Sequence, residues 1–183
     1  MHTGAEAALL GRLAARRRVA VEIGVYEGSS AVVLVRAMDR GATLHLVDPY
    51  VTNALRSGWR GVERATRRTV MREARRHDGP RVRWHVAYSH DAARGWSDPV
   101  DVLFIDGDHT EAGARQDWDD WSGFVVAGGH VVFHDARQGR PGGGGLPGPT
   151  AVADRLFRGP GALAGWELAE EVDSAVVVRR AGA

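Results

Sequence analysis

The sequence predicts an α/β fold with one sheet of seven mostly parallel strands, helices on both faces, and the last strand of a terminal hairpin running antiparallel. Short apolar runs alternate with segments of helical periodicity, which is the pattern of a parallel sheet. Most of these runs end in glycine or in acidic and polar residues. The length of 183 residues suits one domain with a sizeable core. We therefore expect a single domain over residues 1–183, with a leading helix within 1–18 and a doubly wound core over 19–180.

The elements of the N-terminal half follow from caps and periodicity. Thr3 and Glu6 have the spacing of a capping box before an amphipathic segment, so a helix is expected to begin there. Apolar residues recur at helical spacing within the arginine-rich segment 60–76, and residues 81–88 alternate as in a strand. The expected elements are strands at Val19–Gly24, Ala42–Asp48 and Arg81–Tyr88, with helices opening after Thr3, opening at Gly28 and Ser29, and within 60–76.

The C-terminal half contains the most apolar strand. Thr110–Ser122 is expected to be a helix, because Ala114, Trp118 and Trp121 then share one face. The glycine-rich stretch Gly139–Pro149 predicts a mobile loop, and Pro149 can begin the helix that follows. The expected strands are Val100–Asp106, a fifth that follows a glycine turn within Val125–Asp135, and a final pair around Trp166–Glu170 and Ala175–Arg179.

Composition narrows the protein class. The chain has no cysteine, which removes disulfides, thiolate catalysis and cysteine zinc sites. Its net charge is 24 − 23 = +1, and no apolar stretch approaches the roughly 20 residues of a membrane span. We therefore expect a cytoplasmic protein with neither a nucleic-acid nor a membrane partner. The arginines are unevenly distributed along the chain, and we expect them to lie on solvent-exposed faces of helices. The alternative is that they form a docking surface for an acidic substrate or RNA.

A ligand site is expected at one edge of the sheet. In doubly wound sheets, ligands bind outside the carboxyl ends of the strands, and these ends carry "EIGVYEG", "VDPY", "AYSHD", "IDGDH" and "FHDAR". The first turn, "VEIGVYEGSS", lacks the G-x-G-x-x-G spacing that admits a pyrophosphate, which disfavours an NAD-dependent oxidoreductase. Asp48 can accept hydrogen bonds from a ribose diol, or it caps a turn. Together, these features favour a nucleoside without phosphate.

Five motifs, in order, carry a resemblance to a known family. They are "VEIGVYEGSS", "LHLVDPY", "DVLFIDGDHTEAGARQDW", "VAGGHVVFHD" and "GPTAVADRLF". The chain resembles class I S-adenosylmethionine-dependent methyltransferases over Val19 to Arg179, and among them the small-molecule O-methyltransferases of the macrocin and cephalosporin-tailoring kind. The resemblance implies a Rossmann-like fold, S-adenosylmethionine as the cofactor, and a role in natural-product biosynthesis.

The resemblance also implies which residues bind the cofactor. Residues of the first turn would line its methionine part, Asp48 would hold the ribose hydroxyls, and the residues after the third strand would border the adenine. The implied set is Glu22, Gly24, Tyr26, Gly28, Ser29, Asp48, Ser89, His90 and Asp106.

A metal site is implied at Asp106, His134 and Asp135. Relatives usually have an oxygen ligand at the position of His134, and Mg²⁺ prefers oxygen. A histidine there suits a transition metal, or leaves the two carboxylates to bind the ion with waters. The alternative is that both acids shape the pocket by hydrogen bonding, with no ion. We expect Asp108 to cap the next helix or to contact solvent.

His109 is the candidate general base, with Asp106 as its catalytic partner. Methyl transfer to a hydroxyl needs removal of its proton, and a histidine is suited to that task. We expect metal-assisted O-methylation of a small molecule such as a sugar or natural-product scaffold. The alternatives are metal-independent N-methylation, or a cofactor-binding module without catalysis. Pro49–Arg60 and Gly139–Gly148 are candidate lids, and a homodimer that completes a partly open pocket is expected.

Overall fold

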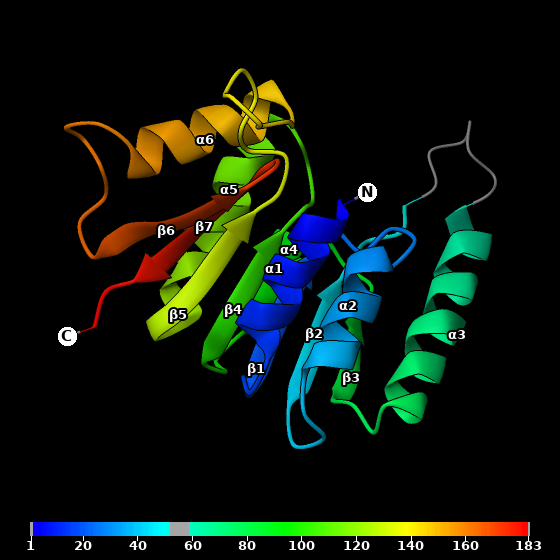
Figure 1. Cartoon of the computed structure of the whole chain (residues 1–183). Helices are drawn as coiled ribbons and strands as arrows, with labels where there is room; N and C mark the ends of the chain where they lie inside the picture. Colours follow the sequence, from blue (N-terminus) through cyan, green and yellow to red (C-terminus); the bar gives the residue numbers. More distant parts are fainter. Residues whose placement is uncertain (1, 52–58, 183) are drawn as a thin grey trace.

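The computed structural model describes residues 2–51 and 59–182. Its core is a seven-stranded sheet of order β3-β2-β1-β4-β5-β7-β6 (Figure 1). Neighbours from β3 to β5 pair in parallel, whereas β7 is antiparallel to both β5 and β6. The predicted sheet, with its reversed last strand, is therefore confirmed. The strands are β1 Val19–Ile23, β2 Thr43–Val47, β3 Arg81–His85, β4 Val100–Ile105, β5 Val125–Phe133, β6 Trp166–Val172 and β7 Ala175–Arg180.

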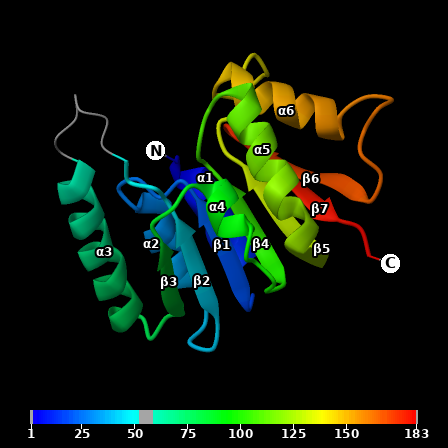
Figure 2. The same ribbon diagram turned by 180° about the vertical axis from the view of Figure 1, so that it is seen from behind.

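Helices cover both faces of the sheet, because successive strand residues point to opposite sides. On one face, α1 to α3 pack on Ala20, Val102 and Phe104 (Figure 1). On the other, α5 and α6 pack on Val21 and Leu103 (Figure 2). The helices are α1 Gly4–Ala14, α2 Ser29–Ala37, α3 Trp59–Arg76, α4 Ser89–Ala93, α5 Glu111–Trp121, the short 3₁₀ helix Ser122–Phe124 and α6 Pro147–Phe157.

The predicted capping box at the start of α1 is confirmed. The Thr3 hydroxyl accepts a hydrogen bond from the Glu6 amide at 3.1 Å, and the Glu6 carboxylate accepts one from the Thr3 amide at 2.7 Å. Both donors would otherwise lack a partner in the first turn of the helix.

The expected glycine turn before the fifth strand is wrong. β5 is continuous over Val125–Phe133, and its register against β4 shifts between Val100 and Val102. Gly128 has a φ of +75°, and a Cβ on Gly129 would lie 3.0 Å from the carbonyl oxygen of Asp101. The glycines thus form an irregularity within the strand, which needs one positive φ and one close backbone approach.

Two other expectations need correction. The third strand ends at His85 rather than at Tyr88. Residues 86–88 connect it to the helix α4, which begins at Ser89 and whose five residues are too few for a periodic signal. α6 begins at Pro147, two residues before the expected proline. The glycine-rich loop returns to the end of β5, where the amide of Leu146 donates to the carbonyl of Asp135 at 2.8 Å. Its mobility stays a prediction.

The lid expected at Pro49–Arg60 falls mainly on residues 52–58, which lie outside the described residues. In the part of the chain that the structure describes, no helix is both long and apolar enough to cross a bilayer.

Candidate active site at the carboxyl edge of the sheet

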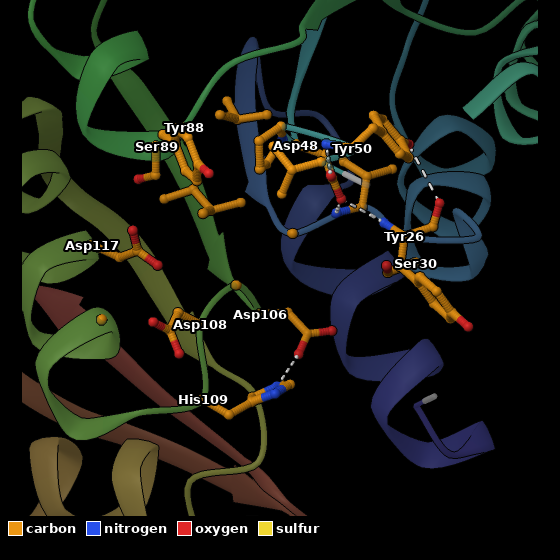
Figure 3. Close-up of a pocket in the computed structure, with 18 of the residues that line it drawn as sticks. Tyr26, Ser30, Asp48, Tyr50, Tyr88, Ser89, Asp106, Asp108, His109 and Asp117 are labelled. Carbon is orange, nitrogen blue, oxygen red and sulfur yellow. Dashed lines mark hydrogen bonds and ion pairs between the residues drawn. The ribbon is translucent and has the colours of Figure 1, made fainter. Parts of the chain in front are cut away.

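A cavity of about 850 Å³ lies over the carboxyl ends of β1, β2 and β4 and the starts of α2, α4 and α5 (Figure 3). The cavity therefore lies at the edge of the sheet where the sheet-edge rule predicted a ligand site. The expected site residues that line the cavity are Gly24, Tyr26, Ser29, Asp48, Ser89, His90, Asp106, His109 and Asp135. Glu22, Gly28 and His134 do not line it.

Each of the two glycines of the first turn is required by a different close approach. Gly24 has a φ of +84°, and a Cβ there would lie 2.0 Å from the carbonyl oxygen of Asp106. Gly24 therefore lets the turn lie against the end of β4 below the cavity. Gly28, with a φ of +78°, precedes α2, and a Cβ there would lie 2.6 Å from the Thr66 methyl group. Gly28 thus allows α2 to approach α3.

Asp48 holds the turns that border the cavity. One carboxylate oxygen accepts hydrogen bonds from the amides of Val25 and Tyr26, both at 2.9 Å (Figure 3). The other accepts one from the Tyr50 amide at 2.7 Å. Asp48 therefore caps these turns, which was one of the two roles predicted for it. The second of these oxygens accepts only one of the three hydrogen bonds and keeps a lone pair, so Asp48 can cap the turn and also accept a ligand hydroxyl.

Glu22 lies beneath the cavity and is completely buried. One of its oxygens accepts a hydrogen bond from the Ser30 hydroxyl at 2.5 Å, and Ser30 itself lines the cavity. Burial raises the pKa of Glu22 to about 8, and this effect outweighs the opposing one of the Ser30 hydrogen bond. Glu22 is therefore mainly protonated at neutral pH, and its direct contact with the methionine part of the cofactor stays a prediction.

The corner predicted to hold the adenine contains a further acid that the sequence analysis did not single out. Ser89 and His90 begin α4, and Asp117 of α5 also lines this corner (Figure 3). Asp117 is only 6% exposed, and burial raises its pKa to about 6. Its position next to Trp118 was the available signal, because it places an acid on the buried face of α5.

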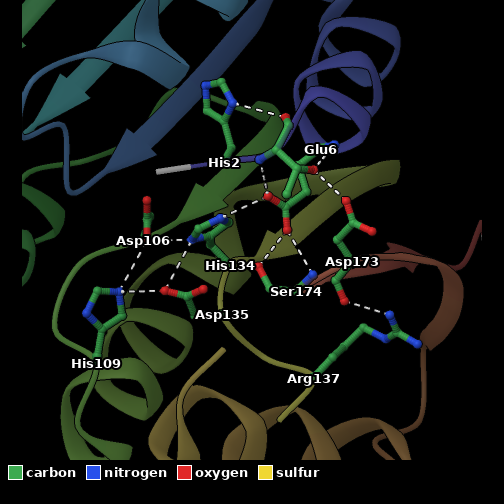
Figure 4. Close-up of polar contacts among 10 residues, drawn as sticks. His2, Glu6, Asp106, His109, His134, Asp135, Arg137, Asp173 and Ser174 are labelled. Atoms are coloured by element: carbon green, nitrogen blue, oxygen red, sulfur yellow. Dashed lines mark hydrogen bonds and ion pairs between the residues drawn. The ribbon is translucent and has the colours of Figure 1, made fainter. Parts of the chain in front are cut away.

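The predicted cluster of acids and histidines is formed at the ends of β4 and β5 (Figure 4). Nδ1 of His134 lies 3.0 Å from Oδ1 of Asp106 and 3.5 Å from Oδ2 of Asp135. Nε2 of His109 approaches the same two oxygens at 3.3 and 3.6 Å. Asp108 does not join them, since its carboxylate accepts from the Thr110 amide at 2.9 Å.

The carboxylates favour the protonated form of both histidines. Burial lowers the pKa of His134, but its contacts with Asp106 and Asp135 outweigh burial and raise it to about 10. The hydrogen bond to Asp106 likewise raises the pKa of His109 above its ordinary value. Burial opposes ionisation of Asp106, yet the two histidines hold its pKa below the ordinary range. The cluster is thus a compact set of paired charges.

The donor atoms fit a divalent cation. One ligand atom each from Asp106, His134 and Asp135 lie within 4.8 Å of one another. One nitrogen and two carboxylate oxygens suit a transition metal such as Mn²⁺ better than Mg²⁺, which prefers oxygen alone. Binding would displace the proton from Nδ1 of His134, so the affinity for a metal must rise with pH.

The strand order, the reversed β7 and the cavity over the first turn together define the class I S-adenosylmethionine-dependent methyltransferase fold. Residues 21–136 match a family described as a methyltransferase domain. The chain belongs to that family and is a methyltransferase. The resemblance noted from the sequence motifs is thereby confirmed.

Solved structures with the same fold differ in their acceptors. The chain is 17% identical to the O-methyltransferase TomG from Streptomyces achromogenes, with a TM-score of 0.70 over 100% of this chain and 82% of TomG. An O-methyltransferase from Bacillus cereus is 15% identical, with a TM-score of 0.63 over 95% of this chain and 78% of that one. An rRNA methylase from Streptococcus thermophilus is 9% identical, with a TM-score of 0.57 over 96% and 94%. At these identities, the likeness shows the fold alone.

Proposed function

We propose that the protein transfers the methyl group of S-adenosylmethionine to a hydroxyl group of a small molecule, with His109 as the general base. The observation that carries the proposal is the position of His109, which lines the cavity beside Asp106 and Asp135. The TomG structure was solved with S-adenosylmethionine and the Bacillus cereus enzyme with S-adenosylhomocysteine, which supports the choice of cofactor.

The residues divide the chemistry between them. S-adenosylmethionine supplies an electrophilic methyl group, which passes from its sulfur to the acceptor oxygen and leaves a neutral thioether. The proton of the acceptor hydroxyl moves to Nε2 of His109, which lines the cavity. The turn held by Asp48 aligns oxygen, methyl and sulfur, which lowers the barrier through orientation.

Asp106, His134 and Asp135 would hold the divalent cation. A bound cation lowers the pKa of an acceptor hydroxyl and orients it. Because it would occupy the carboxylates that now contact His109, the pKa of His109 would fall toward its ordinary value of 6.5. His109 would then be neutral, as a general base must be, over a larger part of the neutral pH range.

A small acceptor agrees with the size of the cavity. Small-molecule sites have volumes of about 300–1,000 Å³, and a cavity of about 850 Å³ can admit a cofactor with a compact acceptor. The small net charge of +1 does not favour an RNA acceptor, although the fold also occurs in an rRNA methylase. A homodimer and a natural-product substrate stay predictions.

The test combines binding with turnover. Calorimetry should detect S-adenosylhomocysteine, and labelled S-adenosylmethionine should methylate members of a panel of phenols, catechols and sugars. EDTA should suppress turnover, and Mn²⁺ should restore it better than Mg²⁺. Transfer only to amines, with no effect of EDTA, would favour the N-methyltransferase alternative. Cofactor binding without transfer to any acceptor would favour the non-catalytic module, and absence of cofactor binding would refute all three.

A further inference from the structure

We propose that Glu6, in the first turn of α1, is a positioning residue that holds the imidazole of His134 with Nδ1 turned toward Asp106 and Asp135. This inference deepens the proposed function, because it treats the cluster around Asp106 as the active centre. A capping box alone would explain Glu6 if its side chain were at the surface, but it is only 2% exposed.

The Glu6 carboxylate is fixed from two distant parts of the chain. Oε2 accepts a hydrogen bond from the Thr3 amide at 2.7 Å. Oε1 accepts from the Ser174 amide at 2.8 Å and from the Ser174 hydroxyl at 2.5 Å (Figure 4). Ser174 lies in the turn between β6 and β7. A carboxylate held by three donors has little freedom to turn, so it can serve as a fixed reference for a neighbouring group.

The neighbouring group is His134. Its Nε2 lies 3.4 Å from Oε2 of Glu6, an ion-pair distance, and its ring is 3% exposed. Within residues 2–51 and 59–182, this nitrogen makes no hydrogen bond with full geometry, so the Glu6 carboxylate is the charged group that compensates it. A buried donor without such a partner destabilises the folded protein, because folding removes its hydrogen bond to water.

The two nitrogens of His134 therefore face different carboxylates. Nε2 faces Glu6 from α1, whereas Nδ1 faces Asp106 from β4 at 3.0 Å (Figure 4). Phe104 packs edge-on against the ring, with the ring centres 5.8 Å apart. A carboxylate on the far nitrogen of a histidine fixes how the ring is turned, and it sets which nitrogen keeps its proton when the other binds a metal. Glu6 thus keeps Nδ1 available to the cluster.

Arg12 offers a matched control on the same helix, because its exposed side chain pairs with Glu170 of β6. Arg12→Gln removes that 2.7 Å ion pair and leaves the contacts of Glu6 with Ser174 and His134 in place. It therefore tests a general weakening of the packing of α1. Glu6→Gln, in contrast, removes the charge that faces Nε2.

The first readout is independent of any ligand. In protein labelled with ¹⁵N-histidine, the Nε2–H signal of His134, assigned by its loss in His134→Asn, should be protected from solvent exchange. Glu6→Gln should shift this signal and speed its exchange at least tenfold, while Arg12→Gln should leave it unchanged. If Glu6→Gln does not fold, Glu6→Asp replaces it, because it keeps the charge but withdraws it by one methylene. An unchanged signal in the Glu6 variant, or an equal change in Arg12→Gln, would overturn the proposal.

The second readout is kinetic. Glu6→Gln should lower kcat by about tenfold to a hundredfold, the usual effect of removing such a partner, with the affinity for S-adenosylhomocysteine unchanged. Arg12→Gln should keep both values within about threefold of the wild type. A fall in cofactor affinity equal to the fall in kcat would indicate a structural role and contradict the inference. If the wild type shows the protected signal but methylates no acceptor, the proposed function fails and the positioning role of Glu6 stands.

Discussion

Glu22→Gln tests the electrostatics of the cavity floor. Because Glu22 is fully buried and its pKa is raised from 4.5 to about 8, the group stabilises the fold fully below pH 4.5. This contribution is lost as the pH rises through about 8. In between, the wild type should lose about 1.4 kcal/mol of stability per pH unit relative to a residue that cannot ionise. Glu22→Gln should therefore gain about 3 kcal/mol on the wild type between pH 4.5 and pH 7.

The assay is urea unfolding of both proteins without ligand at several pH values in this range, followed by tryptophan fluorescence. Glu27→Gln is the matched control, since Glu27 is an exposed acid of the same turn, and its difference from the wild type should stay nearly flat with pH. Because the comparison uses the change of the stability difference with pH, any effect of the amide group that does not vary with pH cancels. If the Glu22→Gln difference changes by less than about 0.5 kcal/mol over the range, Glu22 is ionised in the folded protein and the burial argument fails.

Three further predictions concern the cavity and its histidine. Gly24→Ala should lower the free energy of unfolding in urea by at least about 2 kcal/mol, because its Cβ would lie 2.0 Å from the Asp106 carbonyl. Gly41→Ala is the control, since a Cβ at Gly41 would have no neighbouring atom within 4 Å. Equal unfolding midpoints for the two variants would contradict the reasoning. His109→Ala should lower turnover by about 10²–10⁴-fold with unchanged S-adenosylhomocysteine affinity in calorimetry, and full activity would exclude it as the base. Asp106→Asn should lower the pKa of His109 in an NMR titration of the metal-free protein, since Asp106 is the largest cause of its rise; a constant pKa would show that the pair does not interact.

Sequence reasoning located the site because the rules for parallel sheets are local. Asp106 and Asp135 each follow an apolar strand, and the carboxyl ends of adjacent parallel strands must meet at one edge. Their convergence with His109 and His134 could therefore be predicted without coordinates. The reversed last strand was also expected, and it is confirmed by the pairing of β7.

The parts that sequence reasoning missed depend on distant contacts. Glu6 satisfied a local capping rule, so nothing signalled that its carboxylate also bonds Ser174, 168 positions away. Gly28 was expected to line a ligand, although its contact with Thr66 shows that helix packing requires it. Asp117 was hidden because helical periodicity is counted on apolar residues, and a buried acid on the same face is passed over.

The reversal of β7 has a consequence for the order in which the protein can mature. Because β7 runs opposite to β5, its first residues lie beside the last residues of β5, and Val176 pairs with Phe133. The turn at Ser174 is thereby brought to the cluster, where it meets the first helix of the chain. During synthesis, residues 1–136 can emerge from the ribosome long before this hairpin does. The pocket should then acquire its final shape only when the C-terminal hairpin has docked, so a nascent chain that stops short of it would lack the support on which His134 depends.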